Sequence, residues 1–414
     1  MPDYQSCATI LQAETAFTPV LKQRKIRTLV AYWILGLCNN YGYVVMLTAA
    51  SDIIADNVNE TEEKSTVREC TYMSTGAILL ADILPGLTIK ILAPFLPFFI
   101  HVRVAICVIL AAAGYLTVAF SNSLFLSILG VVLTSFCSGF GEATYLQNVV
   151  SSWSSGTGGA GVIGALSYSV LQALGMRTTL LIMLVIPVAM AIAFWIILPR
   201  PSAEDLAHAL EIQRTVNRGR IIKKKLLLIP GLMKYIIPFS LVYLFEYFIN
   251  QGTFELIQFE DSSLTQQEQY RWLQVTYQVG VFISRSSVNL FHIPQTWTMA
   301  VFQGINVVIF TTEVIYYYIP NFYIVVALVL WEGLLGGSSY VNTFYRISNE
   351  VAEENKQFSM AITTFGDSIG IALAGVLAIY AHNKICDLPI FIFPNHIQEY
   401  NKNQTFRQTF KNEH

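Results

Sequence analysis

Long apolar blocks, each about 20 residues, recur along nearly the whole chain, and they constrain the fold more than any other feature. Hydrophobic residues make up 54% of the 414 residues and charged residues only 13%, against roughly a quarter charged in a typical soluble domain. Blocks of this length cross the hydrocarbon core of a bilayer as α-helices. The sequence therefore predicts an all-α polytopic membrane protein.

We expect eleven transmembrane helices, divided into six and five by one long hydrophilic segment. The predicted spans are residues 29–54, 72–99, 102–121, 124–146, 150–174, 178–199, 230–256, 269–291, 296–317, 321–345 and 357–381. The predicted parts are a cytosolic N-terminal tail (1–28), an N-terminal transmembrane half (29–199), a basic cytosolic central loop (200–228), a C-terminal transmembrane half (229–381) and a C-terminal tail (382–414). A two-halved bundle of this kind is typical of secondary transporters.

The distribution of lysine and arginine predicts the orientation of the spans. With the N-terminus in the cytosol, residues 22–27, the central loop, Arg346 and Lys356 all fall on the cytosolic side, as the positive-inside rule requires. We expect no cleavable signal peptide, so the first span acts as its own signal anchor. The first luminal loop then contains the sequon Asn59-Glu60-Thr61, which makes Asn59 a candidate glycosylation site.

The side of the membrane that holds the C-terminal tail stays open at this point. An odd number of spans places the tail in the lumen, where Asn403 would lie in a second sequon, whereas the apolar stretch 388–394 could return the chain to the cytosol. Cys70 could pair with Cys386 only if the tail is luminal. Three further cysteines lie in predicted spans and are expected to pack as small apolar side chains: Cys38, Cys107 and Cys137.

Polar residues recur at matching places in the two halves of the bundle. Such matches are what internal structural repeats of a transporter produce, and charged groups in lipid are costly enough that they normally face the bundle interior or a wet cavity. We therefore expect a substrate pathway lined by residues of spans 1 and 7, 2 and 8, and 4 and 10: Asn39, Asn40, Lys90, Glu142, Glu246, Asn250, Gln251, Arg285, Glu332 and Asn342.

Several of these residues also have a structural interpretation. Lys90 and Arg285 could extend to the cytosolic interface, although Lys90 lies deeper in its span. Glu142 or Glu332 could neutralise a basic partner, or could carry the proton that drives transport, because burial favours the protonated carboxyl. The basic cluster of the central loop is best explained by topology and contact with anionic lipid.

A glycine-rich run, SWSSGTGGAGVIGA at 152–165, lies within the fifth predicted span. It is no phosphate loop, because no lysine follows and no strand precedes it, and apolar helix continues after it, which argues against a linker. Small residues at helical spacing allow close contact between helices, and this is our preferred interpretation; a locally unwound segment facing a cavity is the alternative. The glycines concerned are Gly156, Gly158, Gly159, Gly161 and Gly164.

No motif of an intramembrane enzyme is present in the sequence. There is no His-Glu-x-x-His, no Gly-x-Gly-Asp around Asp367, and no Gly-x-Ser-Gly paired with an intramembrane histidine. We therefore expect no enzyme activity, no cofactor and no metal site. The expected partners are the lipid bilayer, a small polar or anionic substrate and a coupling proton, and not nucleic acid.

Six stretches, spread in order over nearly every span, resemble the battenin family of neuronal ceroid lipofuscinosis lysosomal membrane proteins. They are residues 35–52, 79–94, 152–168, 245–256, 270–287 and 332–344. The resemblance implies a major-facilitator-like fold in the lysosomal or late endosomal membrane. It also implies a role in export of glycerophosphodiesters, and less directly in transport of basic amino acids such as arginine and in lysosomal pH balance.

The resemblance gives the predicted pathway residues their expected roles. Lys90 and Arg285 would bind the phosphate, and the side-chain amides would serve the glycerol hydroxyls. The chain departs from some relatives in two respects: the central loop has no acidic dileucine motif and the C-terminus, Lys-Asn-Glu-His, is no prenylation box. Its sorting signal thus stays open. The alternative function is a non-transporting membrane scaffold that regulates lysosomal trafficking or pH through protein partners.

Overall fold

The computed structural model describes residues 4–57, 70, 73–92, 99–145, 150–199, 227–259, 262–287 and 293–388, and all regular structure in them is helical. The N-terminal half contains α1 (Tyr4–Thr48), α2 (Ala50–Asn57), α3 (Gly76–Leu92), α4 (Ile100–Ala119), α5 (Leu124–Tyr145), α6 (Val150–Leu171), η2 (Gln172–Leu174), α7 (Met176–Ile182), α8 (Val185–Ile192) and the π-helical η3 (Ala193–Ile197). The C-terminal half contains α11 (Ile229–Phe248), the π-helical η4 (Ile249–Thr253), η5 (Phe254–Leu256), α12 (Gln266–Ser286), α13 (Thr296–Tyr316), α14 (Phe322–Glu350) and α15 (Glu353–Cys386).

Helix lies in each of the eleven predicted spans, but only eight described helical segments are long and apolar enough to qualify as membrane spans by composition. The predicted spans outside this set correspond to α3, α6 and α12. α3 has only 17 residues, α6 contains the glycine run, and α12 begins with the polar sequence QQEQYR. The all-α membrane fold is therefore confirmed, whereas the count of eleven spans stays a prediction.

The segment predicted as the N-terminal tail is helical in the structure, in which α1 begins at Tyr4 and continues without interruption to Thr48. Residues 4–28 thus extend the first membrane helix. Residues 4–28 contain no glycine and a single proline, Pro19, and ten of these 25 residues are alanine, leucine, glutamine or lysine, all of which favour helix.

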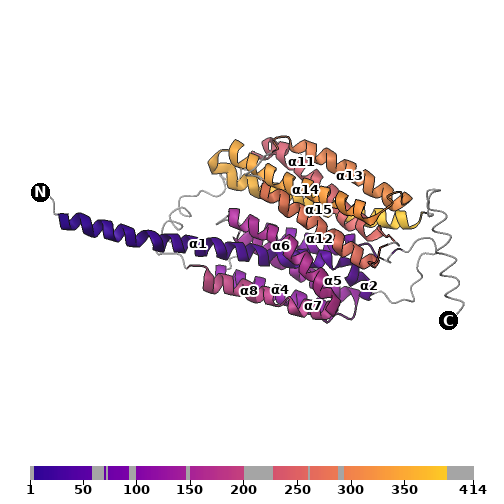
Figure 1. Cartoon of the computed structure of the whole chain (residues 1–414), viewed down its shortest axis with the longest axis horizontal. Helices are drawn as coiled ribbons and strands as arrows, with labels where there is room; N and C mark the ends of the chain where they lie inside the picture. Colours follow the sequence, from indigo (N-terminus) through magenta and orange to yellow (C-terminus); the bar gives the residue numbers. More distant parts are fainter. Residues whose placement is uncertain are drawn as a thin grey trace.

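The two halves form two layers of helices that lie side by side (Figure 1). Within the halves, α1 packs on α6 and α4 on α5, while α12 packs on α14 and α11 on α15. Between the halves, α3 contacts α15 and α6 contacts α12. In chain order this pairs the second predicted span of each half with the fifth span of the other. The reciprocal pairing is what repeated halves related by an approximate two-fold axis produce.

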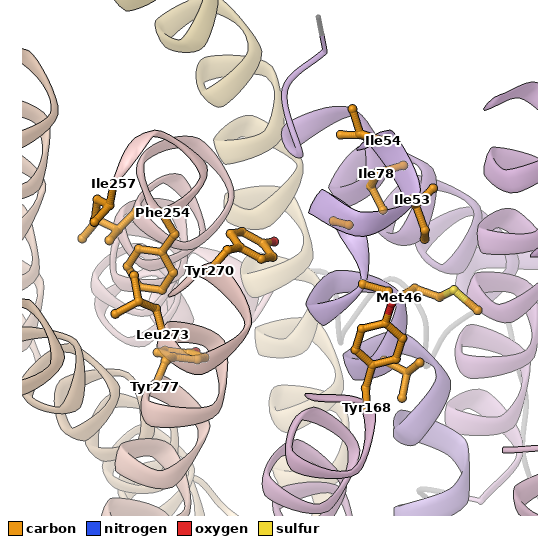
Figure 2. Packing of buried hydrophobic residues seen from close by; sticks show 14 of the residues in the cluster. Met46, Ile53, Ile54, Ile78, Tyr168, Phe254, Ile257, Tyr270, Leu273 and Tyr277 are labelled. Carbon is orange, nitrogen blue, oxygen red and sulfur yellow. The ribbon is translucent and has the colours of Figure 1, made fainter. Parts of the chain in front are cut away.

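A large cluster of buried apolar side chains includes residues of both halves (Figure 2). Met46 and Ile53 come from the first predicted span and Tyr168 from α6, while Phe254 and Tyr270 come from the C-terminal half. All five side chains are less than 2% exposed. The cluster therefore joins the halves through dense packing and not only through polar contacts.

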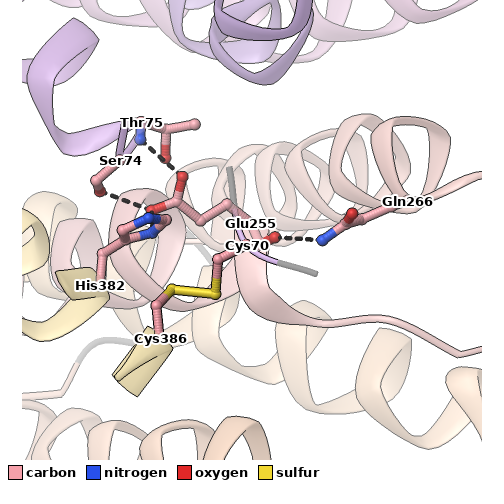
Figure 3. Close-up of a disulfide and its surroundings, with 7 residues drawn as sticks. All are labelled: Cys70, Ser74, Thr75, Glu255, Gln266, His382 and Cys386. Atoms are coloured by element: carbon pink, nitrogen blue, oxygen red, sulfur yellow. Dashed lines mark hydrogen bonds and ion pairs between the residues drawn. A yellow bond between two sulfur atoms is a disulfide. The ribbon is translucent and has the colours of Figure 1, made fainter. Parts of the chain in front are cut away.

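A disulfide joins Cys70, just before α3, to Cys386, the last residue of α15 (Figure 3). The Cα atoms are 6.0 Å apart and 316 residues separate the cysteines in the sequence. The sequence left this pairing conditional on the position of the C-terminal segment, and the structure places the end of α15 beside the loop that precedes α3. We call this end of the bundle the disulfide end. The predicted glycosylation site Asn59 and the tail from 389 lie outside the described residues.

The glycine run is helical throughout, because α6 extends from Val150 to Leu171. The unwound alternative therefore does not describe this conformation. Gly156 lies directly against the backbone carbonyl of Trp33 in α1, and a Cβ at Gly164 would come within 3.3 Å of Val44. Gly161 faces α12, where the side-chain amide of Gln278 occupies the space that a Cβ would take. Gly159 has looser contact, with Trp33 Cζ2 at 3.4 Å.

Gly156 and Gly158 form a matched pair for testing close contact between α6 and α1. Gly156→Ala should lower the free energy of unfolding by about 1–3 kcal/mol, because its Cβ would overlap the Trp33 carbonyl of a neighbouring backbone. Gly158→Ala should be neutral or slightly stabilising, since its Cβ would meet nothing closer than Arg285 Cδ at 3.9 Å. Thermal unfolding of both purified variants measures the difference. Equal stability of the two variants would contradict the packing role of Gly156.

Candidate functional site

Aromatic side chains from three helices gather between the two halves. Tyr243 stacks on Tyr247 of α11 with ring centroids 6.1 Å apart, and Tyr340 lies 4.7 Å from Phe344 of α14. Phe239 contacts both helices' rings, with its centroid 4.8 Å from Tyr243 and 6.2 Å from Tyr340. Tyr43 of α1 packs on the same group. We call these six residues the central aromatic cluster: Tyr43, Phe239, Tyr243, Tyr247, Tyr340 and Phe344.

Arg285, in the last turn of α12, lies against this cluster. Its guanidinium carbon is 4.1 Å from the centre of the Tyr340 ring, and Nη2 donates a hydrogen bond to the Tyr243 hydroxyl at 3.3 Å. Among the described residues no carboxylate lies within 4.0 Å of it. Gly158 of α6 lies beside the arginine stem, since a Cβ there would be 3.9 Å from Arg285 Cδ. The side chain is therefore held between the halves by rings and not at the membrane interface by lipid.

Lys90, the other predicted cation, is paired. Its Nζ lies 2.7 Å from Oε2 of Glu142, and the two side chains are 19% and 21% exposed. The lysine comes from α3 and the glutamate from α5, so the pair links two helices of one half. Lys90 also interacts electrostatically with Asp367 and Tyr340 of the other half. The interpretation of Glu142 as the neutraliser of a basic partner thus describes the structure, and Lys90 is no free anion site here.

Glu246 and Glu332 lie deeper, on α11 and α14. The Tyr277 hydroxyl donates to Oε1 of Glu246, and Gly336 leaves the space that the same carboxylate fills. Glu332 is fully buried, and neither of its oxygens has a hydrogen-bond partner among the described residues. A buried carboxylate without partners is costly when ionised. An ionised side chain is therefore costly at Glu246 and at Glu332. The same holds for Asp82, whose two carboxylate oxygens are buried without a hydrogen-bond partner among the described residues.

Two of the predicted pathway amides connect helices or loops. The Asn39 amide donates to the carbonyl of Ser138 at 2.9 Å, which joins α1 to α5. Oδ1 of Asn342 accepts from the backbone N–H of Ile293 at 2.6 Å, and its amide donates to the Ser338 carbonyl. Asn342 therefore anchors the chain ahead of α13, which is a structural role. Asn40 is only partly buried beside Asn39.

Asn250 and Gln251 lie in η4, a π-helical turn that ends the long helix α11. Single π-helical turns are rare and often mark functional sites. The Gln251 side chain accepts a hydrogen bond from Tyr270 at 2.9 Å, and the Asn250 carbonyl accepts one from Gln274 at 3.1 Å. The turn thus joins α11 to α12 within the C-terminal half.

A buried ion pair at the disulfide end was missed from the sequence. Arg271 Nη1 of α12 lies 2.6 Å from Oδ1 of Asp52 in α2, and the side chains are 7% and 8% exposed. The Tyr168 hydroxyl of α6 donates to the other Asp52 oxygen at 3.0 Å. Both charges sit near the ends of predicted spans, where the sequence pattern indicates ordinary loop charge, so only their contact across the halves reveals the pair.

A second buried network lies beside the disulfide (Figure 3). The Glu255 carboxylate accepts hydrogen bonds from the Ser74 hydroxyl at 2.6 Å and the Thr75 N–H at 2.7 Å, and it lies 3.0 Å from Nδ1 of His382. Gln266 donates to the Glu255 carbonyl at 2.8 Å. The network attaches the start of α3 to η5 and α15.

Comparison with known proteins identifies the family. The family model described as CLN3 protein matches residues 30–220 and 207–388. The chain is 40% identical over 404 residues to battenin of Canis lupus familiaris, covering 87% of this chain and 92% of battenin. It is 33% identical over 434 residues to Protein BTN1 of Chaetomium globosum, covering 89% and 90% of the two chains.

The chain belongs to the CLN3 protein family. This confirms the resemblance that the six stretches indicated.

Solved structures with the same fold are far less similar in sequence. A bacterial homologue of the human lysosomal transporter Spinster, in an inward-facing and unoccupied conformation, matches with a TM-score of 0.58 at 12% identity, covering 85% of this chain and 81% of that one. A D-xylose–proton symporter matches with a TM-score of 0.56 at 11% identity, covering 88% and 98%. The CLN3 family member thus has a major-facilitator-like, two-halved membrane fold.

The Lys90–Glu142 pair should contribute to stability through mutual compensation. Lys90→Gln leaves the Glu142 carboxylate without its partner and should lower the free energy of unfolding by about 1–3 kcal/mol. The double variant Lys90→Gln/Glu142→Gln should recover at least half of that loss, because no uncompensated charge remains. Thermal unfolding in detergent measures both values.

The exposed pair Arg346–Glu350 supplies the control for this prediction. Arg346→Gln should cost less than Lys90→Gln, because Glu350 is 38% exposed and water can solvate it. A double variant no more stable than Lys90→Gln would show that the two charges do not depend on each other.

Proposed function

We propose that this CLN3 family member is a non-enzymatic transporter of small polar anions, and that it exports them from the lysosome or late endosome. The observation that carries the proposal is Arg285, a cation between the halves that is held by Tyr243 and Tyr340. Among the described residues no carboxylate lies within 4.0 Å of it, and Glu246 attracts it only from farther away. A structural arginine inside a bundle would be expected to pair with a carboxylate. Arg285 keeps donors that a substrate anion can use.

The preferred substrate class is the glycerophosphodiesters. A phosphodiester carries a negative charge throughout the range between an acidic lumen and a neutral cytosol, and arginine keeps its positive charge over the same range. The guanidinium can bind two phosphate oxygens at once. The hydroxyl of Tyr243, which lies beside Arg285, is suited to a glycerol hydroxyl. The family resemblance points to the same substrates.

Glu246 and Glu332 are the proposed carriers of a coupling proton. Both are buried, Glu332 has no hydrogen-bond partner among the described residues, and the two carboxylates interact with each other. Neighbouring acidic groups in a dry environment favour at least one proton between them. The acidic lumen would load this proton, and the cytosol would accept it.

We infer that the disulfide end faces the lumen. Disulfides persist in oxidising compartments and are rare in the cytosol, whereas Lys25, Arg27 and Arg346 lie at the opposite end, as the positive-inside rule requires of the cytosolic side. In this orientation α15 ends on the luminal side.

Removal of the sequon tests the orientation. Asn59→Gln should remove the mass of one glycan from protein made in cells that glycosylate secretory proteins, because the loop before α3 would be luminal. Electrophoresis before and after glycosidase treatment measures the change, with Asn403→Gln as the matched variant in the C-terminal segment. Glycosylation of a sequon newly introduced into the central loop would overturn the orientation.

Substitution of Arg285 tests the anion site. In proteoliposomes of purified protein, Arg285→Gln should reduce uptake of glycerophosphoglycerol about 10-fold or more, the loss expected for a hydrogen bond to a charged group. Arg285→Lys should retain part of the activity, because the charge survives while the planar donor geometry is lost.

Two controls make the result specific. Arg346→Gln, which removes a partly exposed cation from the C-terminal end of α14, should leave uptake unchanged, and gel filtration should show all variants folded. Normal uptake by Arg285→Gln would overturn the role of Arg285. Absence of uptake by the unmodified protein would instead favour the non-transporting scaffold.

A further inference from the structure

The halves meet along two rows of contacts, which we call contact lines: α3 with α15, and α6 with α12. At the disulfide end the two lines are held by different types of bond. On the first line, where α3 meets α15, the Cys70–Cys386 disulfide covalently links the N-terminal half to the C-terminal half. Just below it the helices touch through their backbones, since a Cβ at Gly76 would lie 2.9 Å from both Ala378 Cβ and the Gly375 carbonyl. The backbones of α3 and α15 are therefore in direct contact along this line.

The Glu255 network strengthens the same line. It holds Ser74 and Thr75, at the start of α3, against η5 and His382 of α15, and Glu255 and His382 are both 2% exposed at their side chains. Thr75 also donates to the Gln251 carbonyl at 2.8 Å. One covalent bond and three buried hydrogen bonds therefore join the halves on this side, two to the Glu255 carboxylate and one to the Gln251 carbonyl.

The second line, where α6 and α2 meet α12, is held by separable contacts. Arg271 binds Asp52, which also accepts from Tyr168, and the Tyr270 hydroxyl donates to the Leu47 carbonyl at 2.9 Å. A surface cavity of about 530 Å³, which we call the vestibule, borders the ion pair. Its lining includes Asp52, Asp56, Gln172, Thr265 and Arg271. Water in this vestibule can solvate both charges as the pair separates, so the cost of breaking it is far below that of a sealed ion pair.

We propose that the halves part at the disulfide end by pivoting about the α3–α15 line, so that solutes enter only on the side of α12, through the vestibule, when Asp52 releases Arg271. The disulfide then acts as a fixed hinge and the ion pair as the latch. This inference rests on the proposed transport function only for the identity of the solute, because the opening itself can be measured without transport.

Thiol labelling of the two contact lines tests the hinge. Val275→Cys places a buried probe on α12, four residues inside the latch, and Ala378→Cys places one on α15 beneath the disulfide; the native side chains are 6% and 0% exposed. Both are made in a background in which the four cysteines outside the disulfide, Cys7, Cys38, Cys107 and Cys137, are alanine and the native disulfide is intact.

Weakening the latch should expose one probe and not the other. Adding Asp52→Asn with Arg271→Gln, which removes both charges and leaves none unpaired, should raise the rate of maleimide labelling of Val275→Cys about 10-fold or more. Labelling of Ala378→Cys should change less than two-fold. Arg346→Gln at the opposite end should change neither rate. An equal rise at both probes would show symmetric opening, and an unchanged rate at Val275→Cys would show that the pair is no latch; either result overturns the proposal.

A cross-link separates this inference from the proposed function. In Asp52→Cys/Arg271→Cys protein, joining the two introduced cysteines with a short bis-maleimide should abolish uptake of glycerophosphoglycerol in proteoliposomes. The native disulfide should stay formed on non-reducing gels in actively transporting protein. Transport only by protein in which the Cys70–Cys386 bond is open would overturn the hinge. Asymmetric labelling without any transport would instead leave the hinge standing and refute the transport function.

Discussion

A charged side chain inside a bilayer has no water to solvate it, and this constraint arranges the middle of the molecule. Lys90 and Arg285 are therefore each stabilised by specific neighbouring side chains. Lys90 is neutralised by Glu142 of a neighbouring helix, whereas Arg285 is held by the ring of Tyr340 and the hydroxyl of Tyr243. Rings stabilise an arginine without neutralising its charge, so the positive charge of Arg285 can still attract an anion. The charge of Lys90 is largely neutralised by Glu142.

Close contact between helices makes these arrangements geometrically feasible. Gly156 lets α6 approach the backbone of α1, and Gly336 leaves space for the Glu246 carboxylate. At Gly336 the missing side chain makes room for a charged group. Glycines in this bundle therefore position charge as well as pack helices.

The disulfide end differs from the middle because its charges are paired across the halves. Asp52 and Arg271 come from different halves, and the Glu255 network attaches α3 of one half to η5 and α15 of the other. Together with the shared apolar cluster, these contacts close this end of the bundle.

The sequence by itself determined the class of fold, the division into halves and the kinds of residue that face the interior. Apolar blocks of membrane length and a single basic insertion are sufficient for the first two, and the cost of charge in lipid is sufficient for the third, so Lys90, Glu142, Glu246, Arg285 and Glu332 could all be named. The length of α1 could not, since the polar residues before the first span are also good helix formers.

Only the tertiary structure decided which of these residues are partners. A helical period fixes the face on which Lys90 lies but not which helix packs there, so its pairing with Glu142, and not with Asp82, depends on the contact of α3 with α5. The same holds for Asp52 with Arg271 and for Cys70 with Cys386, which are separated by 219 and 316 residues. Such contacts depend on how the two halves pack against each other. The residue pattern within a single span does not contain this information.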